Sequence, residues 1–181
     1  MIWRVFVKGY KSLQNVNLDL RRLTVIIGPN ASGKSNLFDA LRLLSRILTS
    51  RSLVDAFEDH RGDPLEAFDF GEGGISGLLK KEEARFTIEV DVELSDETVQ
   101  KAEKQIQQYR SSDQNGYKGK SRRVVERLLR YRITVSITPK TGVLRVMDEY
   151  LAALKRENGR LIQKENRQPF LEKKGNRIRL R

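Results

Sequence analysis

The strongest constraint on the fold of this chain comes from the segment Gly28-Pro29-Asn30-Ala31-Ser32-Gly33-Lys34-Ser35. Two glycines five positions apart, followed by lysine and serine, form a spacing typical of loops that bind phosphate groups. The β-prone run Leu23–Ile27 comes just before and predicts a strand buried on both faces of a sheet. After the loop, leucines recur at helical spacing from Leu37 to Leu48. Residues 23–48 are therefore predicted to form a strand, a glycine-rich loop and an amphipathic helix.

Each fixed residue of this motif has a role in holding a triphosphate. Gly28 and Gly33 allow the backbone to curl, so that successive N–H groups point at phosphate oxygens. The helix that starts at Gly33 adds the positive end of its dipole to the same place. Lys34 supplies a cation that can bridge the β- and γ-phosphates, and the Ser35 hydroxyl is an oxygen ligand suited to Mg²⁺. The alternatives are a turn without a ligand and a loop that binds nucleotide without hydrolysing it.

Alternating apolar residues predict strands elsewhere in the chain. The expected strands lie at Ile2–Val7, Val16–Leu20, Phe86–Val92, Tyr131–Ile137 and Val143–Leu154. Asn158-Gly159 predicts a hairpin turn, and Gly175-Asn176 a second turn.

Helices and irregular segments are predicted between these strands. Ser95 can cap a helix that runs to about Tyr109, with acidic residues in its first turn. A short helix is expected around Val124–Leu129. We expect residues 53–82, which are rich in glycine, and residues 111–121 to be irregular.

Composition narrows the classes of protein that this chain can belong to. It has no cysteine, which excludes disulfide bonds and cysteine-ligated zinc. No stretch approaches the run of about 20 apolar residues that a membrane helix needs, and the N-terminus does not resemble a signal peptide. These observations predict a cytoplasmic protein without a membrane partner.

The net charge of +11 is unevenly distributed. Residues 1–100 carry 13 basic and 16 acidic side chains, whereas residues 101–181 carry 22 basic and 8 acidic ones. A basic surface of this kind can attract nucleic acid. It can equally be a solvated surface, or one that another segment covers, because aromatic residues are not interleaved with the charges.

The segment Gly28–Leu37 closely resembles the phosphate-binding loop of ABC-type ATPases, and within that class the RecF, SMC and OLD (overcoming lysogenization defect) group. The opening strand followed by Gly9–Leu13, and the run Leu37–Leu41 after the loop, support the narrower resemblance. The resemblance is sharp over residues 1–50 and loose beyond. It implies an α/β fold, the N-terminal lobe of a P-loop NTPase of the ABC-ATPase type. Residues 1–52 would be the nucleotide-binding core and residues 53–181 a β-rich, basic lateral subdomain with a helical insertion.

The resemblance also implies roles for individual residues. Lys34 would be the catalytic residue and Ser35 the metal ligand, with ATP and Mg²⁺ as cofactors. Lys11 and Ser12 would lie near the base or ribose of the nucleotide. The full set of nucleotide-binding residues would be Gly28, Pro29, Asn30, Ala31, Ser32, Gly33, Lys34, Ser35, Asn36, Lys11 and Ser12. Ala31 departs from the family, which often has glycine at this position.

Several parts of a complete ATPase site are missing from this chain. The family places a strand-end carboxylate and a Ser-Gly-Gly type loop in a C-terminal lobe. Gly71–Ser76 has a similar composition in the wrong order, and we interpret it as a loop. Asp148 and Glu149 imitate the strand-end carboxylates. We interpret them as a surface pair because Arg145 interrupts the preceding strand, with a catalytic pair as the alternative. The one histidine, His60, is interpreted as a polar loop residue, with a γ-phosphate sensor as the alternative.

We therefore expect ATP binding here and ATP hydrolysis once a C-terminal lobe and a second subunit complete the site. The resemblance links such activity to DNA repair or anti-phage defence. The expected partners are a second ATPase half or a second copy of the chain, a nuclease domain or partner, and DNA. The alternative is a non-catalytic module that binds nucleic acid or a protein partner on a P-loop scaffold.

Overall fold

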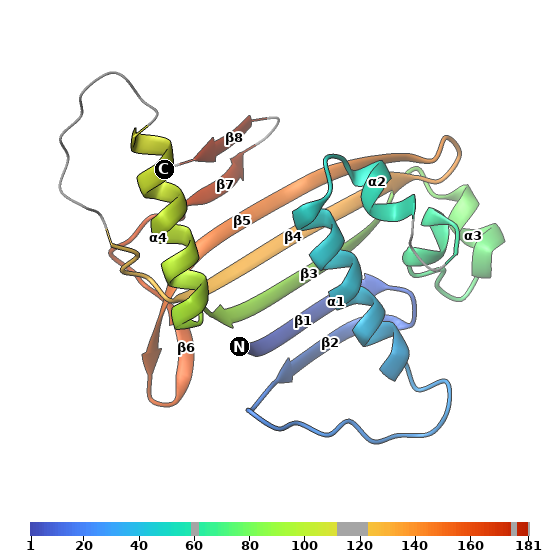
Figure 1. Ribbon diagram of the computed structural model, residues 1–181. Helices are drawn as coiled ribbons and strands as arrows, with labels where there is room; N and C mark the ends of the chain where they lie inside the picture. The colour runs from blue at the N-terminus through green and yellow to red at the C-terminus, as the bar shows by residue number, and fades with distance from the viewer. Residues whose placement is uncertain (59–61, 112–122, 175–176, 181) are drawn as a thin grey trace.

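A computed structural model describes residues 1–58, 62–111, 123–174 and 177–180, and shows an eight-stranded antiparallel sheet with helices (Figure 1). The order across the sheet is β2-β1-β3-β4-β5-β7-β8, and β6 pairs with β5. The strands are β1 Ile2–Tyr10, β2 Leu13–Asp19, β3 Ala84–Glu93, β4 Leu128–Thr138, β5 Val143–Glu157, β6 Arg160–Gln163, β7 Leu171–Lys174 and β8 Arg177–Leu180. The five strands predicted from alternation are confirmed, and each is part of this sheet.

The helices are unequal in length. The longest are α1, Lys34–Thr49, and α4, Asp96–Ser111. Between α1 and β3 come α2, Leu53–Glu58, the 3₁₀ helix η1, Pro64–Ala67, and α3, Gly74–Lys80. Figure 1 shows α1 lying across β1 and β3, so one face of the sheet carries the helix that follows the glycine-rich loop.

Two local predictions from residue chemistry are confirmed. The Ser95 hydroxyl accepts a hydrogen bond from the backbone N–H of Thr98 at 3.2 Å, which caps α4. Asn158 and Gly159 both have positive φ, 48° and 77°, as a tight hairpin turn between β5 and β6 requires.

The core lies between the sheet and α1. Alternation places Val5 and Val7 of β1 and Ile88 of β3 on the covered face, where each is fully buried. The ring of Phe86 lies at its centre, with ring centroids 5.4 Å from Tyr10 and 5.0 Å from Phe68. Helix α1 contributes its own buried stripe to this core, namely Leu37, Ala40, Leu43 and Leu44. Burial of this stripe fixes the helix, and therefore the end of the glycine-rich loop.

The prediction of an irregular segment at 53–82 is wrong, because α2, η1 and α3 lie within it. The Asp63 carboxylate accepts a hydrogen bond from the Leu65 N–H at 2.8 Å and starts η1. Buried Phe57 and Leu78 hold α2 and α3 in place despite the weak helical propensity of glycine. The interpretation of Gly71–Ser76 as a loop is also wrong, since α3 begins inside it.

The predicted helix at Val124–Leu129 is absent, because this segment leads directly into β4. Leu128 and Leu129 lie opposite Glu93 and Val92 of β3. Hydrogen bonding to β3 stabilises a strand here, although the local spacing of apolar residues favours a helix.

The predicted buried strand at Leu23–Ile27 is wrong as well. This segment has no assigned strand, and the exposed fractions of Leu23, Val25 and Ile27 are 83%, 71% and 90%. A β-strand needs at least one neighbouring strand to pair with, and no described strand pairs with this run. Just before this run, the Leu20 N–H donates a 2.7 Å hydrogen bond to the Trp3 carbonyl and so connects the chain to the sheet.

Some predictions remain outside these observations. His60, the turn at Gly175-Asn176 and residues 112–121 of the predicted polar loop lie outside the described residues. The division of the chain at residue 52 stays a prediction, although β1 and β2 share a sheet with β3 and β4. In the part of the chain that the structure describes, no helix is long and apolar enough to cross a membrane.

Candidate nucleotide-binding site

The loop from Gly28 to Gly33 is curled and leads directly into α1. Ala31 and Gly33 have left-handed backbone conformations, with φ of 63° and 89°. Glycine adopts this conformation without strain, whereas alanine pays a steric cost. A side chain at position 28 would have its Cβ 3.0 Å from the Ser32 hydroxyl, inside the curl. The glycine at position 28 therefore keeps the interior of the loop open.

The ammonium group of Lys34 lies against the inside of this loop. Its Nζ donates hydrogen bonds to the carbonyl oxygens of Gly28 at 2.7 Å and Pro29 at 2.6 Å. The Ser32 hydroxyl is a third, longer partner at 3.3 Å. Because these acceptors are exposed and uncharged, negatively charged phosphate oxygens can replace them and form stronger hydrogen bonds with the ammonium.

The N-terminus of α1 fits an anion. Its first turn holds no acidic residue, and no side chain caps the Gly33 end. The first N–H groups of a helix lack partners within the helix, and the dipole places partial positive charge at the same end. Together with the open loop and Lys34, these donors form a set that fits a phosphate group.

The turn between β1 and β2 lies beside the start of α1. The Asn36 side-chain amide donates a 2.8 Å hydrogen bond to the Ser12 hydroxyl. A Cβ on Gly33 would lie 3.0 Å from the same hydroxyl, so the contact is close. Lys11 forms an ion pair with Asp39 one turn further along the helix. The structure thus brings the predicted residues Lys11, Ser12 and Asn36 together.

Asp39 is a residue of this site that sequence reasoning missed. Its carboxylate accepts a 2.9 Å hydrogen bond from the Tyr10 hydroxyl in addition to the Lys11 ion pair. Burial of Tyr10, and then its hydrogen bond to Asp39, raise the pKa of this phenol above its ordinary value. The available signal was spacing, because Asp39 follows Asn36 by three residues and shares its helix face.

A cavity of about 1070 Å³ runs along α1 from the N-terminal turn. Its polar lining begins at Ser35, the predicted Mg²⁺ ligand, and continues through Asp39 to Arg42. Phe38 and Phe70 contribute apolar surface. Binding cavities for small molecules combine a largely apolar wall with a few polar groups in this way, so the cavity extends the site beyond the phosphate-binding loop.

The carboxylates that imitate a catalytic pair have structural partners. Asp148 accepts a 2.9 Å hydrogen bond from Arg132, and Glu149 accepts one from the Tyr131 hydroxyl at 2.8 Å. Both residues lie in the middle of β5 rather than at its end. Among the described residues, no group of three or more His, Cys, Asp or Glu side chains could hold a metal ion. The role of Ser35 as a Mg²⁺ ligand stays a prediction, in which phosphate and water would complete the metal shell.

Comparison with known proteins identifies the class. Residues 23–170 match the family described as "AAA domain, putative AbiEii toxin, Type IV TA system", and the chain belongs to this family of P-loop ATPases. The predicted ATPase family is confirmed, and membership implies nucleotide binding.

A more particular similarity is to the DNA replication and repair protein RecF of Bacillus cytotoxicus. The chain is 29% identical to this protein over 92 residues, which cover 50% of the chain. The chain spans 23% of the length of that relative. The similarity supports the RecF resemblance, but the activity of the whole relative does not transfer to this chain directly.

Proposed function

We propose that this chain binds Mg-ATP through the loop Gly28–Asn36, and that a C-terminal lobe and a second subunit complete it for hydrolysis. The observation that carries the proposal is the curled loop in front of α1, with the Lys34 ammonium inside it and an uncapped helix N-terminus behind it. Family membership supports nucleotide as the ligand. ATP is the nucleotide that the resemblance implies.

Each residue of the loop would make a distinct contribution. Backbone N–H groups of the loop and of the first turn of α1 would hold the phosphates, and Lys34 would move from the loop carbonyls to phosphate oxygens. The Ser35 hydroxyl would be a ligand of Mg²⁺, which supplies positive charge next to the phosphates. Ser12 is held by Asn36 beside the loop, where it would limit how the nucleotide enters.

Completion by further protein is supported by the exposed run at Leu23–Ile27. Three apolar side chains of this run face solvent immediately before the phosphate-binding loop. Exposed apolar segments of this kind are typical of surfaces that another polypeptide covers. We propose that a C-terminal lobe or a second ATPase half covers this run and supplies the carboxylate and the Ser-Gly-Gly loop.

Isothermal titration calorimetry tests the nucleotide site. We expect Mg-ATP to bind the wild-type chain and Lys34→Ala to abolish detectable binding, because the ammonium has no substitute in the loop. Lys140→Ala, at an exposed turn between β4 and β5, is the matched control and should bind as the wild type does. Equal affinity of the Lys34→Ala and wild-type chains would refute the assignment.

We further propose that ATP binding serves DNA repair or anti-phage defence, with DNA and a nuclease domain or partner involved. The similarity to a DNA replication and repair protein, RecF, and the basic second part of the chain support this proposal. A second candidate is a non-catalytic module in which the P-loop is a scaffold for nucleic-acid binding. Salt-dependent DNA binding without any calorimetric response to ATP would favour this second candidate.

A further inference from the structure

The face of the sheet that α1 does not cover carries a hollow surrounded by arginines. Its volume is about 450 Å³. It lies where the start of β1, the end of β2, β4 and the β5–β6 hairpin come together. Five arginines and two aspartates line it, namely Arg4, Arg21, Arg130, Arg156, Arg160, Asp19 and Asp91. We refer to this feature as the arginine hollow.

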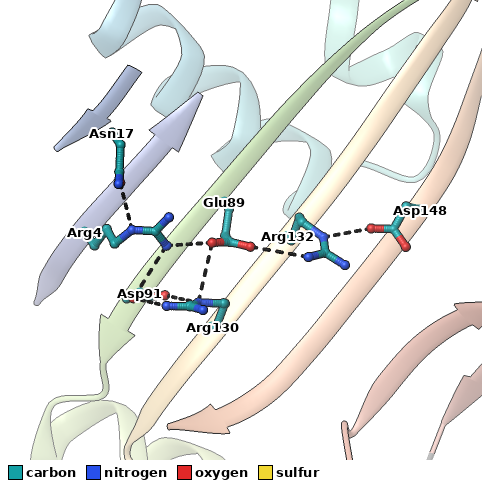
Figure 2. Close-up of polar contacts among 7 residues, drawn as sticks. All are labelled: Arg4, Asn17, Glu89, Asp91, Arg130, Arg132 and Asp148. Carbon is teal, nitrogen blue, oxygen red and sulfur yellow. Dashed lines mark hydrogen bonds and ion pairs between the residues drawn. The ribbon is translucent and has the colours of Figure 1, made fainter. Parts of the chain in front are cut away.

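The floor of the arginine hollow is a network of charges in which the carboxylates are buried and the arginines half-buried, and Figure 2 shows it on the strands with the helices behind. Arg4 donates to Glu89 at 2.6 Å, and Arg130 makes two 2.7 Å hydrogen bonds to Asp91. The exposed fraction of Asp91 is 0%, so its carboxylate depends entirely on these partners. The floor is electrically balanced and holds its two arginines in fixed positions.

These floor arginines still have hydrogen-bond donors to offer. A guanidinium group carries five N–H donors in a planar arrangement. Among the described residues, the side-chain hydrogen bonds of Arg130 use its Nε and Nη2, and those of Arg4 use its Nε and Nη1. Each side chain therefore retains N–H groups for a ligand in the hollow that it lines.

The rim of the hollow carries positive charge that is not balanced. Arg21, Arg156 and Arg160 are exposed, and none of them forms an ion pair with a carboxylate of a described residue. The Arg156 guanidinium lies 4.5 Å from the centre of the Trp3 ring, which orients it without neutralising it. Against these three cations, the rim has the single carboxylate of Asp19. The rim therefore attracts anions.

We propose that the arginine hollow binds backbone phosphates of a nucleic acid. All of its basic side chains are arginine, whose planar donors match phosphate oxygens better than lysine does. The rim cations come from the segment after β2 and from both strands of the β5–β6 hairpin, so they can contact successive phosphates rather than one small anion. Because the proposed contacts are to phosphates and not to bases, we expect binding that does not depend on nucleotide sequence.

The proposal rests on the DNA-linked part of the proposed function and not on the nucleotide site. The test uses the full chain and fluorescein-labelled 20-nucleotide single-stranded and duplex DNA, with fluorescence anisotropy measured over a series of salt concentrations. Arg156→Gln combined with Arg160→Gln should lower the affinity about tenfold and reduce the salt slope by about 2, one for each lost phosphate contact.

The matched control is Arg51→Gln combined with Arg179→Gln. Both arginines are exposed and lie outside the hollow, and replacing them removes the same total charge as the first double variant does. This control should keep a near wild-type affinity and salt slope. Circular dichroism melts of both double variants check that the fold is retained.

Several outcomes would overturn the proposal. Equal losses in the two double variants would show that total charge alone attracts DNA. Absence of DNA binding by the wild-type chain would overturn it too, even if inorganic phosphate or free ATP were found to bind in the hollow. Calorimetry of Mg-ATP on the same variants should be unchanged, and a loss there would concern the nucleotide site instead.

Discussion

The two faces of the sheet are built from the same strands but have opposite chemistry. On the face under α1, Val5 and Ile88 are fully buried against apolar neighbours. On the other face, Arg4 and the carboxylates of Glu89 and Asp91 alternate with those residues along β1 and β3. Since side chains of a strand alternate between faces, one sequence serves two surfaces.

This difference indicates that the two faces of the sheet contribute to the structure in different ways. The apolar face obtains stability from packing and fixes α1, which positions the phosphate-binding loop. The charged face obtains order from paired charges, whose mutual attraction is largely offset by the cost of removing them from water. The apolar face should therefore dominate the free energy of unfolding, and the charged face should be sensitive mainly to the loss of one partner from a pair.

The largest effect should come from the apolar face. Phe86→Ala removes the ring at the centre of the aromatic cluster and leaves a cavity beneath α1. We expect the free energy of unfolding to fall by about 3–5 kcal/mol, as measured by urea denaturation. Phe86→Leu retains most of the volume and is the control. A loss below about 1 kcal/mol for Phe86→Ala would contradict the dominant role of this face.

The next effect tests the charged face. Asp91→Ala leaves the half-buried Arg130 without its main partner, and we expect a loss of about 3 kcal/mol. The double variant Asp91→Leu with Arg130→Met removes both charges, and most of the stability should return. A double variant as unstable as Asp91→Ala would show that the charges themselves, rather than their pairing, stabilise the sheet.

A smaller effect is expected from a polar group on the apolar face. Tyr10→Phe removes the hydrogen bond to Asp39 and should cost about 1 kcal/mol at neutral pH. Burial raises the pKa of Tyr10, and likewise of Tyr131, so the folded chain keeps protons that the unfolded chain releases above pH about 10.

Stability should therefore decline as the pH rises above the ordinary tyrosine pKa. In urea titrations at a series of pH values, Tyr10→Phe should show a shallower decline than the wild type. Identical slopes in the two chains would argue against the burial of this phenol.

The smallest effect is expected from a neutral pair on the charged face. The hydroxyls of Thr87 and Thr134 are 2.9 Å apart across β3 and β4. Thr134→Val should change the free energy of unfolding by about 0.5 kcal/mol, because threonine and valine are similar in shape and valine is common in strands. A loss above about 2 kcal/mol in a thermal melt would show that this face depends on more than its ion pairs.

The sequence predicted the parts of the fold that have a period. The strands at Phe86–Val92 and Tyr131–Ile137 were recognisable because their alternating residues face two different environments. Helix α1 was recognisable from its leucine stripe. The short helices α2, η1 and α3 were missed, because their stability comes from tertiary contacts rather than from local propensity.

The candidate site was predictable in its loop and not in its surroundings. The spacing of Gly28, Gly33 and Lys34 predicts the loop, and family resemblance predicts Lys11 and Ser12, which the structure places beside it. The roles of these residues in binding stay predictions. Asp39 was missed, since its partners Tyr10 and Lys11 lie far away in sequence and only folding brings them together. The strand at Leu23–Ile27 was predicted wrongly, because a β-prone run forms a strand only when a neighbour is present to pair with it.

Packing against the core anchors the glycine-rich loop at its C-terminal end only. Helix α1 anchors its C-terminal end in the core, whereas the chain leading into it from Leu20 is largely solvated. Ordering residues 21–27 costs conformational entropy, and without a partner the free energy of nucleotide binding must offset this cost. A further lobe that bound this segment would order it in advance and lower that cost. By thermodynamic linkage, ATP would then raise the affinity for the lobe by the same factor by which the lobe raises the affinity for ATP.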